Sequence, residues 1–259
     1  VFGIDTTKAA AISGILGILL FASPKMGGVL DNTAKVLGTV MLVLIGYVAF
    51  STNPPVAEAA THAIVPTNYP WLATITLIGG TVGGYITFSG GHRLIDAGIT
   101  GREHLKDVRR AAFMGMSVDA IVRILLFLAV LGVVSMGFAL DPMDPAGSAF
   151  LLGAGEIGHK LFGIVFFCAA LTSVVGAAYT SVSFLKTLFK VVERYEKLTI
   201  MVFIFVSTCI LIFIGKPATL LIVAGSVNGL ILPVTLAVML LATRKTNIVG
   251  DYKHNPILF

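Results

Sequence analysis

The residues of this sequence that are best suited to bind an ion or a solute are glycines and polar residues inside apolar stretches. The stretch 78–93 holds six glycines within thirteen residues, together with Thr81 and Tyr85. Glycine costs about 1 kcal/mol relative to alanine inside a helix, so this stretch is a poor continuous helix. A helix broken within a membrane frees carbonyl groups that can coordinate an ion or a polar solute. Close helix packing through Gly79 and Gly83, spaced four apart, explains the same pattern equally well.

Asp119 and Arg123 form a second candidate group. They are four residues apart in another apolar stretch and are therefore neighbours on one helix face. Because a lone charge is costly in lipid, we expect the two side chains to neutralise each other while facing the bundle interior or water. A proton or ion relay and a structural ion pair both fit this spacing.

Hydroxyl and amide side chains give a third group. Thr172 and Ser173 lie in the stretch 154–185, and Ser226 and Asn228 lie in the last apolar stretch. Hydroxyl oxygens can coordinate a hard cation. On membrane helices, however, hydroxyls commonly bond the carbonyl four residues earlier. Helix–helix hydrogen bonding explains Ser226 and Asn228 as well as ligand binding does.

The rest of the sequence does not support catalysis or nucleic-acid binding. It contains no recognisable Ser/His/Asp or Cys/His set, and no H-x-x-x-H or H-E-x-x-H spacing. The two cysteines, Cys168 and Cys209, lie in apolar stretches and make no metal motif. The net charge of +5 comes from short clusters between apolar stretches. We therefore expect no enzyme, no nucleic-acid partner and no cofactor.

Membrane helices are the elements that must position these residues. Of 259 residues, 56% are hydrophobic and 12% are charged, about half the charge of a soluble domain. Seven apolar stretches are long enough to cross a hydrocarbon core of roughly 30 Å as helices. They cover residues 7–23, 33–51, 71–91, 112–139, 154–185, 198–215 and 218–243. The sequence therefore predicts an all-helical, polytopic membrane protein.

The distribution of Lys and Arg predicts the orientation of these spans. The loops 24–35, 92–110 and 186–197 and the tail after residue 243 hold fourteen such residues, against three in the opposite segments. By the positive-inside rule, this places the N-terminus outside and the C-terminus in the cytoplasm. The odd number of spans and a first residue that is Val also lead us to expect an N-terminally truncated sequence.

Three motifs are similar to those of one transporter family. Residues 79–85, 170–173 and 232–245 resemble the natural-resistance-associated macrophage protein (NRAMP) family of divalent metal transporters. The resemblance implies a five-plus-five inverted-repeat fold with a metal site between unwound segments of the first and sixth helices. It also implies that metal entry is coupled to protons.

The resemblance places the chain at the family's fourth to tenth helices, in a single transmembrane domain over 1–259. Residues 7–51 correspond to the end of the first repeat, 71–243 to the second repeat, and 244–259 to a cytoplasmic tail. The first three helices, with the family's D-P-G-N metal motif, are absent.

The resemblance also implies roles for individual residues. Gly80 takes the position whose carbonyl contacts the metal, Gly83 falls where the family has its methionine ligand, and Tyr85 falls at its histidine. Loss of the thioether shifts the expected substrate toward harder or larger hydrated cations. The stretch 198–215 lacks the arginine that lies on the family's proton route. The pair of Asp119 and Arg123 in the fourth stretch could replace that proton route.

We therefore expect a secondary transporter of divalent cations that works by alternating access, with H⁺ or Na⁺ as the coupling ion. The expected binding residues are Gly80, Thr81, Gly83, Tyr85, Thr172, Ser173 and Asn228. The expected partners are the lipid bilayer, the metal ion and the missing helices, in a plasma membrane of prokaryotic type. A sodium- or proton-coupled carrier of a small organic solute and a non-transporting scaffold are the alternatives.

Overall fold

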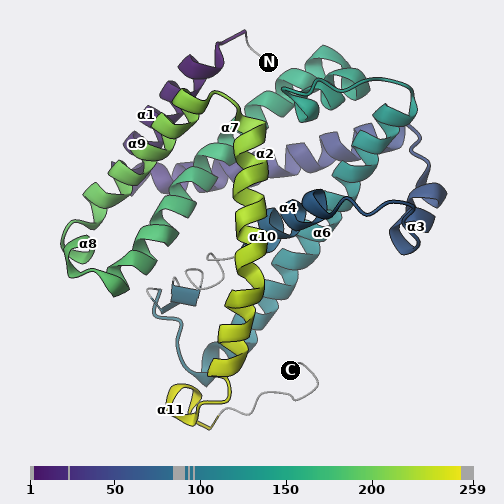
Figure 1. Cartoon of the computed structure of the whole chain (residues 1–259). Coiled ribbons are helices and arrows are strands. Elements are labelled where there is room, and N and C mark those ends of the chain that lie inside the picture. Colours follow the sequence, from purple (N-terminus) through teal and green to yellow (C-terminus); the bar gives the residue numbers. More distant parts are fainter. Residues whose placement is uncertain (1–2, 23, 84–90, 93, 96, 252–259) are drawn as a thin grey trace.

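The computed structural model of the chain describes residues 3–22, 24–83, 91–92, 94–95 and 97–251. Within these residues the chain forms helices and no strand, as Figure 1 shows. The all-helical membrane fold predicted from the sequence is therefore confirmed. Tyr85, one of the expected binding residues, lies outside the described residues.

Seven of the described helices follow the predicted apolar stretches with shifted ends, and the short helices α3, α8 and α11 lie outside them. In chain order they are α1 Thr6–Ala22, α2 Pro24–Ser51, α3 Val56–Ile64, α4 Trp71–Val82, α6 Leu105–Ser135, α7 Pro145–Leu188, α8 Lys190–Arg194, α9 Glu196–Ile214, α10 Pro217–Ala242 and α11 Thr246–Val249. The predicted loop 24–35 is instead part of α2, which begins at Pro24, because proline is compatible with the first turn of a helix. The end of the predicted loop 92–110 is also helical, as a 3-10 turn at Arg102–His104 followed by the start of α6.

Helix α7 is the longest helix, with 44 residues, and begins earlier than the predicted stretch 154–185. Its start is fixed by Asp144, whose carboxylate accepts a hydrogen bond from the Gly147 N–H at 2.9 Å. Such a cap satisfies a backbone donor that the first helical turn leaves free. Gly155 interrupts the helical geometry with φ 68° and ψ −169°. The helix therefore consists of a short segment before Gly155 and a long segment after it.

Four helical segments are long and apolar enough to cross a membrane: Arg102–Ser135, α7, α9 and α10. The end of α2 and α3 would add a fifth span if they cross together, although they are bent by 101° where they meet. Helices α1 and α4 are apolar but shorter, with 17 and 12 residues. For the described residues, length and composition thus support four or five spans. The count of seven and the inverted repeat stay predictions.

Bulky side chains form two cores that share α7. The first lies between α2, α6 and α7, where Val48 and Phe150 are fully buried. The ring of Phe150 stacks on that of Phe162, with centroids 4.5 Å apart. The second core lies between α1, α7 and α9 and contains Val182 and Ile200. These cores join α1, α2, α6, α7 and α9 into one body.

Helices α4 and α10 form a pair of their own. In Figure 1, α4 lies against the middle of α10, and the most extensive packing of each helix in the described chain is with the other. A smaller contact joins α10 to α9. The described start of the glycine-rich stretch, at the end of α4, is therefore positioned chiefly by α10.

Candidate substrate site at the end of α4

Helix α4 ends where the glycine-rich stretch predicted a break. Its last residue is Val82, and Gly83 follows with φ 69° and ψ 136°, a left-handed conformation that glycine adopts easily. The Gly83 N–H donates to the Gly79 carbonyl oxygen at 3.1 Å. A helix end leaves the remaining carbonyls of its last turn without partners in the helix, and the helix dipole adds partial negative charge there. The end of α4 therefore favours a cation.

Gly79 has a packing role. It is buried against α10, and a Cβ on it would collide with the carbonyl oxygen of Gly225 and the backbone nitrogen of Gly229. A Cβ on Gly225 would in turn lie 2.8 Å from the Thr76 carbonyl oxygen. Close packing and a helix break were alternatives for this stretch at the level of sequence. The structure shows the close packing at Gly79 and the end of α4 at Val82, and the residues that would continue a broken helix, 84–90, lie outside the described residues.

Gly80 and Thr81 lie on an exposed part of α4. No described atom lies within 4 Å of a Cβ built on Gly80. The Thr81 hydroxyl donates to the Leu77 carbonyl oxygen at 2.5 Å, so its lone pairs stay available to accept or coordinate. Among the described residues, nothing occupies this side of the helix.

A hydroxyl pair links α4 to α10. The Oγ1 atom of Thr76 lies 2.7 Å from the Oγ atom of Ser226. Helix–helix hydrogen bonding, one of the two roles considered for Ser226, is therefore the role that the structure shows. Asn228 is half-buried on the same helix, between Gly225 and Gly229 in the sequence.

Thr172 and Ser173 lie on α7, which is not among the helices that pack extensively against α4 in the described chain. The Thr172 hydroxyl donates to the Ala169 carbonyl oxygen at 2.8 Å. Thr180 and Ser181 bond the carbonyls four residues earlier in the same way. These are local bonds of the kind expected for hydroxyls on membrane helices. In the described chain, α7 and α4 share no extensive contact, and a role of Thr172 and Ser173 in binding stays a prediction.

The ion pair predicted from the spacing of Asp119 and Arg123 is present on α6. The Nε atom of Arg123 lies 2.7 Å from the Oδ2 atom of Asp119. The two side chains are 43% and 53% exposed, respectively, so the pair lies on the side of α6 and not in a core. Its role as a relay stays a prediction.

The described residues contain no group of three or more His, Cys, Asp or Glu side chains that could hold a metal ion. The oxygens identified at the end of α4, the carbonyls of its last turn and the Thr81 hydroxyl, are neutral. Such oxygens suit hard cations better than soft ones.

Comparison with known proteins decides the family. The family described as natural resistance-associated macrophage protein-like matches residues 1–259, the full length of the chain. The chain belongs to the Nramp-like family. Nramp-like proteins are membrane transporters and not enzymes, in line with the lack of a catalytic set in the sequence.

Two relatives of this Nramp-like chain are membrane proteins. The uncharacterized membrane protein YcsG of Bacillus subtilis is 49% identical over 253 residues, which cover 98% of this chain and 63% of the relative. An uncharacterized membrane protein of Haemophilus influenzae is 49% identical over 254 residues, which cover 98% of this chain and 64% of the relative. The chain thus spans less than two thirds of either relative. No solved structure matches it.

Sequence reasoning missed two features of this Nramp-like chain. Gly225 and Gly229 are spaced as in the G-x-x-x-G motif of packed membrane helices, and that spacing was a sufficient signal. Glu58 and His62, on the unpredicted helix α3, are also four residues apart and form an ion pair. The H-x-x-x-H spacing requires two histidines, so it does not detect a glutamate and a histidine four residues apart.

Proposed function

We propose that the whole protein is a secondary transporter of divalent metal cations, coupled to protons and working by alternating access. The observation that supports this most directly is the end of α4 at Gly83, inside the glycine-rich stretch, in a member of the Nramp-like family. The proposal places the protein in a prokaryotic plasma membrane with its C-terminus in the cytoplasm. Its partners are the bilayer, the metal ion and helices beyond this chain.

On this proposal, the end of α4 supplies half of the cation site. The carbonyl oxygens around Gly80, with the Thr81 hydroxyl, replace part of the water shell of the cation, and the helix dipole adds to the attraction. Gly79 fixes the height and angle of this helix end by its contact with α10. A carboxylate from a helix outside this chain completes the site and balances the charge.

Cation uptake by the whole protein in proteoliposomes tests this proposal. Gly80→Leu fills the open space beside the last turn of α4, and we expect it to reduce Mn²⁺ and Mg²⁺ uptake without changing the unfolding temperature. Gly46→Leu is a matched control, because Gly46 lies in α2 and also has no described atom within 4 Å of a built Cβ. Uptake that is equal in the two variants, or absent from the unmodified protein, contradicts the proposal.

A sodium- or proton-coupled carrier of a small organic solute is the second candidate. Its support is the neutral character of the described part of the site and the glycine at position 83, where the family resemblance implies a methionine ligand. This candidate predicts uptake of a labelled amino acid or carboxylic acid that follows an imposed Na⁺ or H⁺ gradient. Uptake should then persist when divalent metals are removed with a chelator.

A non-transporting membrane scaffold is the candidate of another class. The tight contact of Gly79 with α10 supports it, since packing alone can explain part of the glycine pattern. It predicts that the purified whole protein takes up neither cations nor solutes under any gradient. Gly80→Leu would then have no measurable phenotype, whereas the transport proposals require one.

A further inference from the structure

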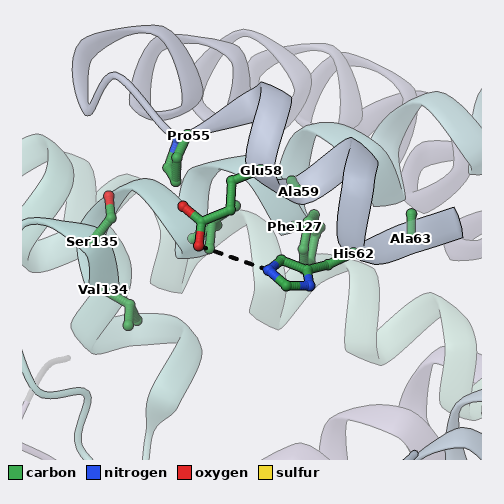
Figure 2. Close-up of a pocket in the computed structure, with 9 residues that line it drawn as sticks. Pro55, Glu58, Ala59, His62, Ala63, Phe127, Val134 and Ser135 are labelled. Carbon is green, nitrogen blue, oxygen red and sulfur yellow. Dashed lines mark ion pairs between the residues drawn. The ribbon is translucent and has the colours of Figure 1, made fainter. Parts of the chain in front are cut away.

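A groove between α3 and α6 contains titratable side chains that the proposed function does not use. It has a volume of about 450 Å³, and its walls include Phe127 and Val134 of α6. Its polar lining consists of Glu58, His62 and Ser135. Figure 2 shows the Glu58 carboxylate and the His62 imidazole reaching toward each other within the groove. Two different elements thus direct a carboxylate, an imidazole and a hydroxyl to one concave surface.

The geometry of the pair suits a metal ion. The Oε1 atom of Glu58 and the Nε2 atom of His62 are 3.8 Å apart, one helical turn from each other on α3. Metal–nitrogen and metal–carboxylate distances are about 2.0 to 2.2 Å for zinc, so a cation between these two atoms can bind both. Only small rotations of the side chains are needed, and the backbone can stay in place.

The pair is open on the described surface of the chain. The Ser135 hydroxyl, which also lines the groove, donates to the Gly132 carbonyl oxygen at 2.8 Å. The His62 and Glu58 side chains are 49% and 69% exposed, respectively, so the described part of the chain does not cover them. A cation held here would keep water in its remaining positions. Such a site exchanges its ion readily.

We propose that Glu58 and His62 form an open site for a divalent transition-metal cation in the α3–α6 groove, completed by water. Imidazole nitrogen is a good ligand for Zn²⁺, Co²⁺ and Ni²⁺ and a poor one for Mg²⁺, which sets the class of ion. On the orientation predicted from the sequence, the groove opens on the side opposite the cytoplasm. This proposal is about equilibrium binding of the ion, and it does not depend on the proposed transport function.

Titration of the purified whole protein with Co²⁺, followed by calorimetry, tests the site. We expect the double variant Glu58→Gln and His62→Asn to lose one binding event, or to bind about tenfold or more weakly. Glu156→Gln is the matched control, because Glu156 is an exposed carboxylate that pairs with Lys160 at the same spacing. The proposal is overturned if the double variant binds like the unmodified protein or if the control loses as much.

Two more measurements keep the test independent of folding. Glu58→His places two imidazoles one turn apart, and we expect it to bind Co²⁺ more tightly; unchanged or weaker binding overturns the proposed geometry. Excess Mg²⁺ should leave Co²⁺ bound, and displacement by Mg²⁺ overturns the proposed role of the imidazole. Because uptake is a separate measurement, a protein that binds Co²⁺ here but transports no cation refutes only the proposed function.

Discussion

The α4–α10 pair and the α2–α6–α7 core are held together in different ways. In the core, large side chains such as Phe150 and Phe162 fill the space between the helices. In the pair, Gly79 of α4 meets Gly225 and Gly229 of α10, so backbone lies against backbone. A side-chain core can adjust to a substitution by changing rotamers, whereas a backbone contact cannot.

The difference follows from how helices associate in lipid. Lipid is as apolar as a core, so close van der Waals packing and interhelical hydrogen bonds replace the hydrophobic force between helices. Small residues allow the closest approach and therefore fix position most narrowly. The helix that ends in the candidate cation site is held in this way. We conclude that the close backbone contact with α10 defines the position of the C-terminal end of α4 tightly.

The largest effect on the α4–α10 pair is expected from Gly79→Leu. We expect the variant to abolish docking of α4 on α10, because the atoms that a side chain would meet belong to the backbone. A cross-link between Thr76→Cys and Ser226→Cys measures docking directly, since the hydroxyl oxygens of these residues are 2.7 Å apart. Gly80→Leu is the neighbouring control and should leave the cross-link intact. Equal cross-linking in the two variants would falsify the backbone-contact argument.

Phe150→Ala tests the other region. Removing a buried phenylalanine costs about 3–5 kcal/mol in soluble proteins, and we take this as the upper limit because lipid lowers the transfer contribution. Denaturant unfolding in mixed micelles measures the loss. The cross-link between α4 and α10 should form as before. If it is lost as well, the two regions are not independent.

A smaller effect is expected from the hydroxyl pair. Replacing both members, as Thr76→Val with Ser226→Ala, removes one interhelical hydrogen bond, and such bonds contribute about 0.6 kcal/mol and at most about 1.7 kcal/mol in membranes. A double-mutant cycle on unfolding free energy measures the coupling. A coupling energy well above this range would show that the hydroxyls, and not the glycines, hold the pair together.

Asp119→Asn should have the smallest effect on stability. Ion pairs that face water contribute about 0.2–1 kcal/mol, and this range applies if the Asp119 and Arg123 side chains, which are about half exposed, face water and not lipid. Under the relay hypothesis, the variant would nevertheless uncouple cation uptake from the proton gradient while leaving the α4–α10 cross-link unchanged. A stability loss of several kcal/mol would instead indicate that the pair is buried against a part of the protein outside this chain.

The helical class, the end of α4 within the glycine-rich stretch and the ion pair on α6 could be predicted because each depends on local spacing. Glycines at short intervals weaken a helix at any position, and charges four residues apart meet on any helix. Asp119 and Arg123 therefore paired as expected. The family could also be predicted, since its motifs are short and contiguous.

Other features depend on which helices meet, and local spacing could not predict them. Nothing near Gly79 in the sequence specifies Gly225 and Gly229 as its neighbours. Thr172 and Ser173 were expected at the site, but α7 does not pack extensively against α4 in the described residues. Helix α3 was missed for a different reason, since its nine residues are too few to give a periodic signal.

The hydroxyl protons of Thr76 and Ser226 can be shared in a way that affects how easily α4 and α10 separate. Each hydroxyl also lies within bonding distance of a carbonyl in its own helix, Leu72 at 2.7 Å and Ile222 at 2.8 Å. Three short contacts, one between the hydroxyls and one from each hydroxyl to a carbonyl, thus share two hydroxyl protons. At any moment, one of the three contacts therefore lacks a proton. If the helices part, each proton turns to its own carbonyl and the number of hydrogen bonds stays the same. The polar link between α4 and α10 can therefore open and close without leaving a donor unsatisfied.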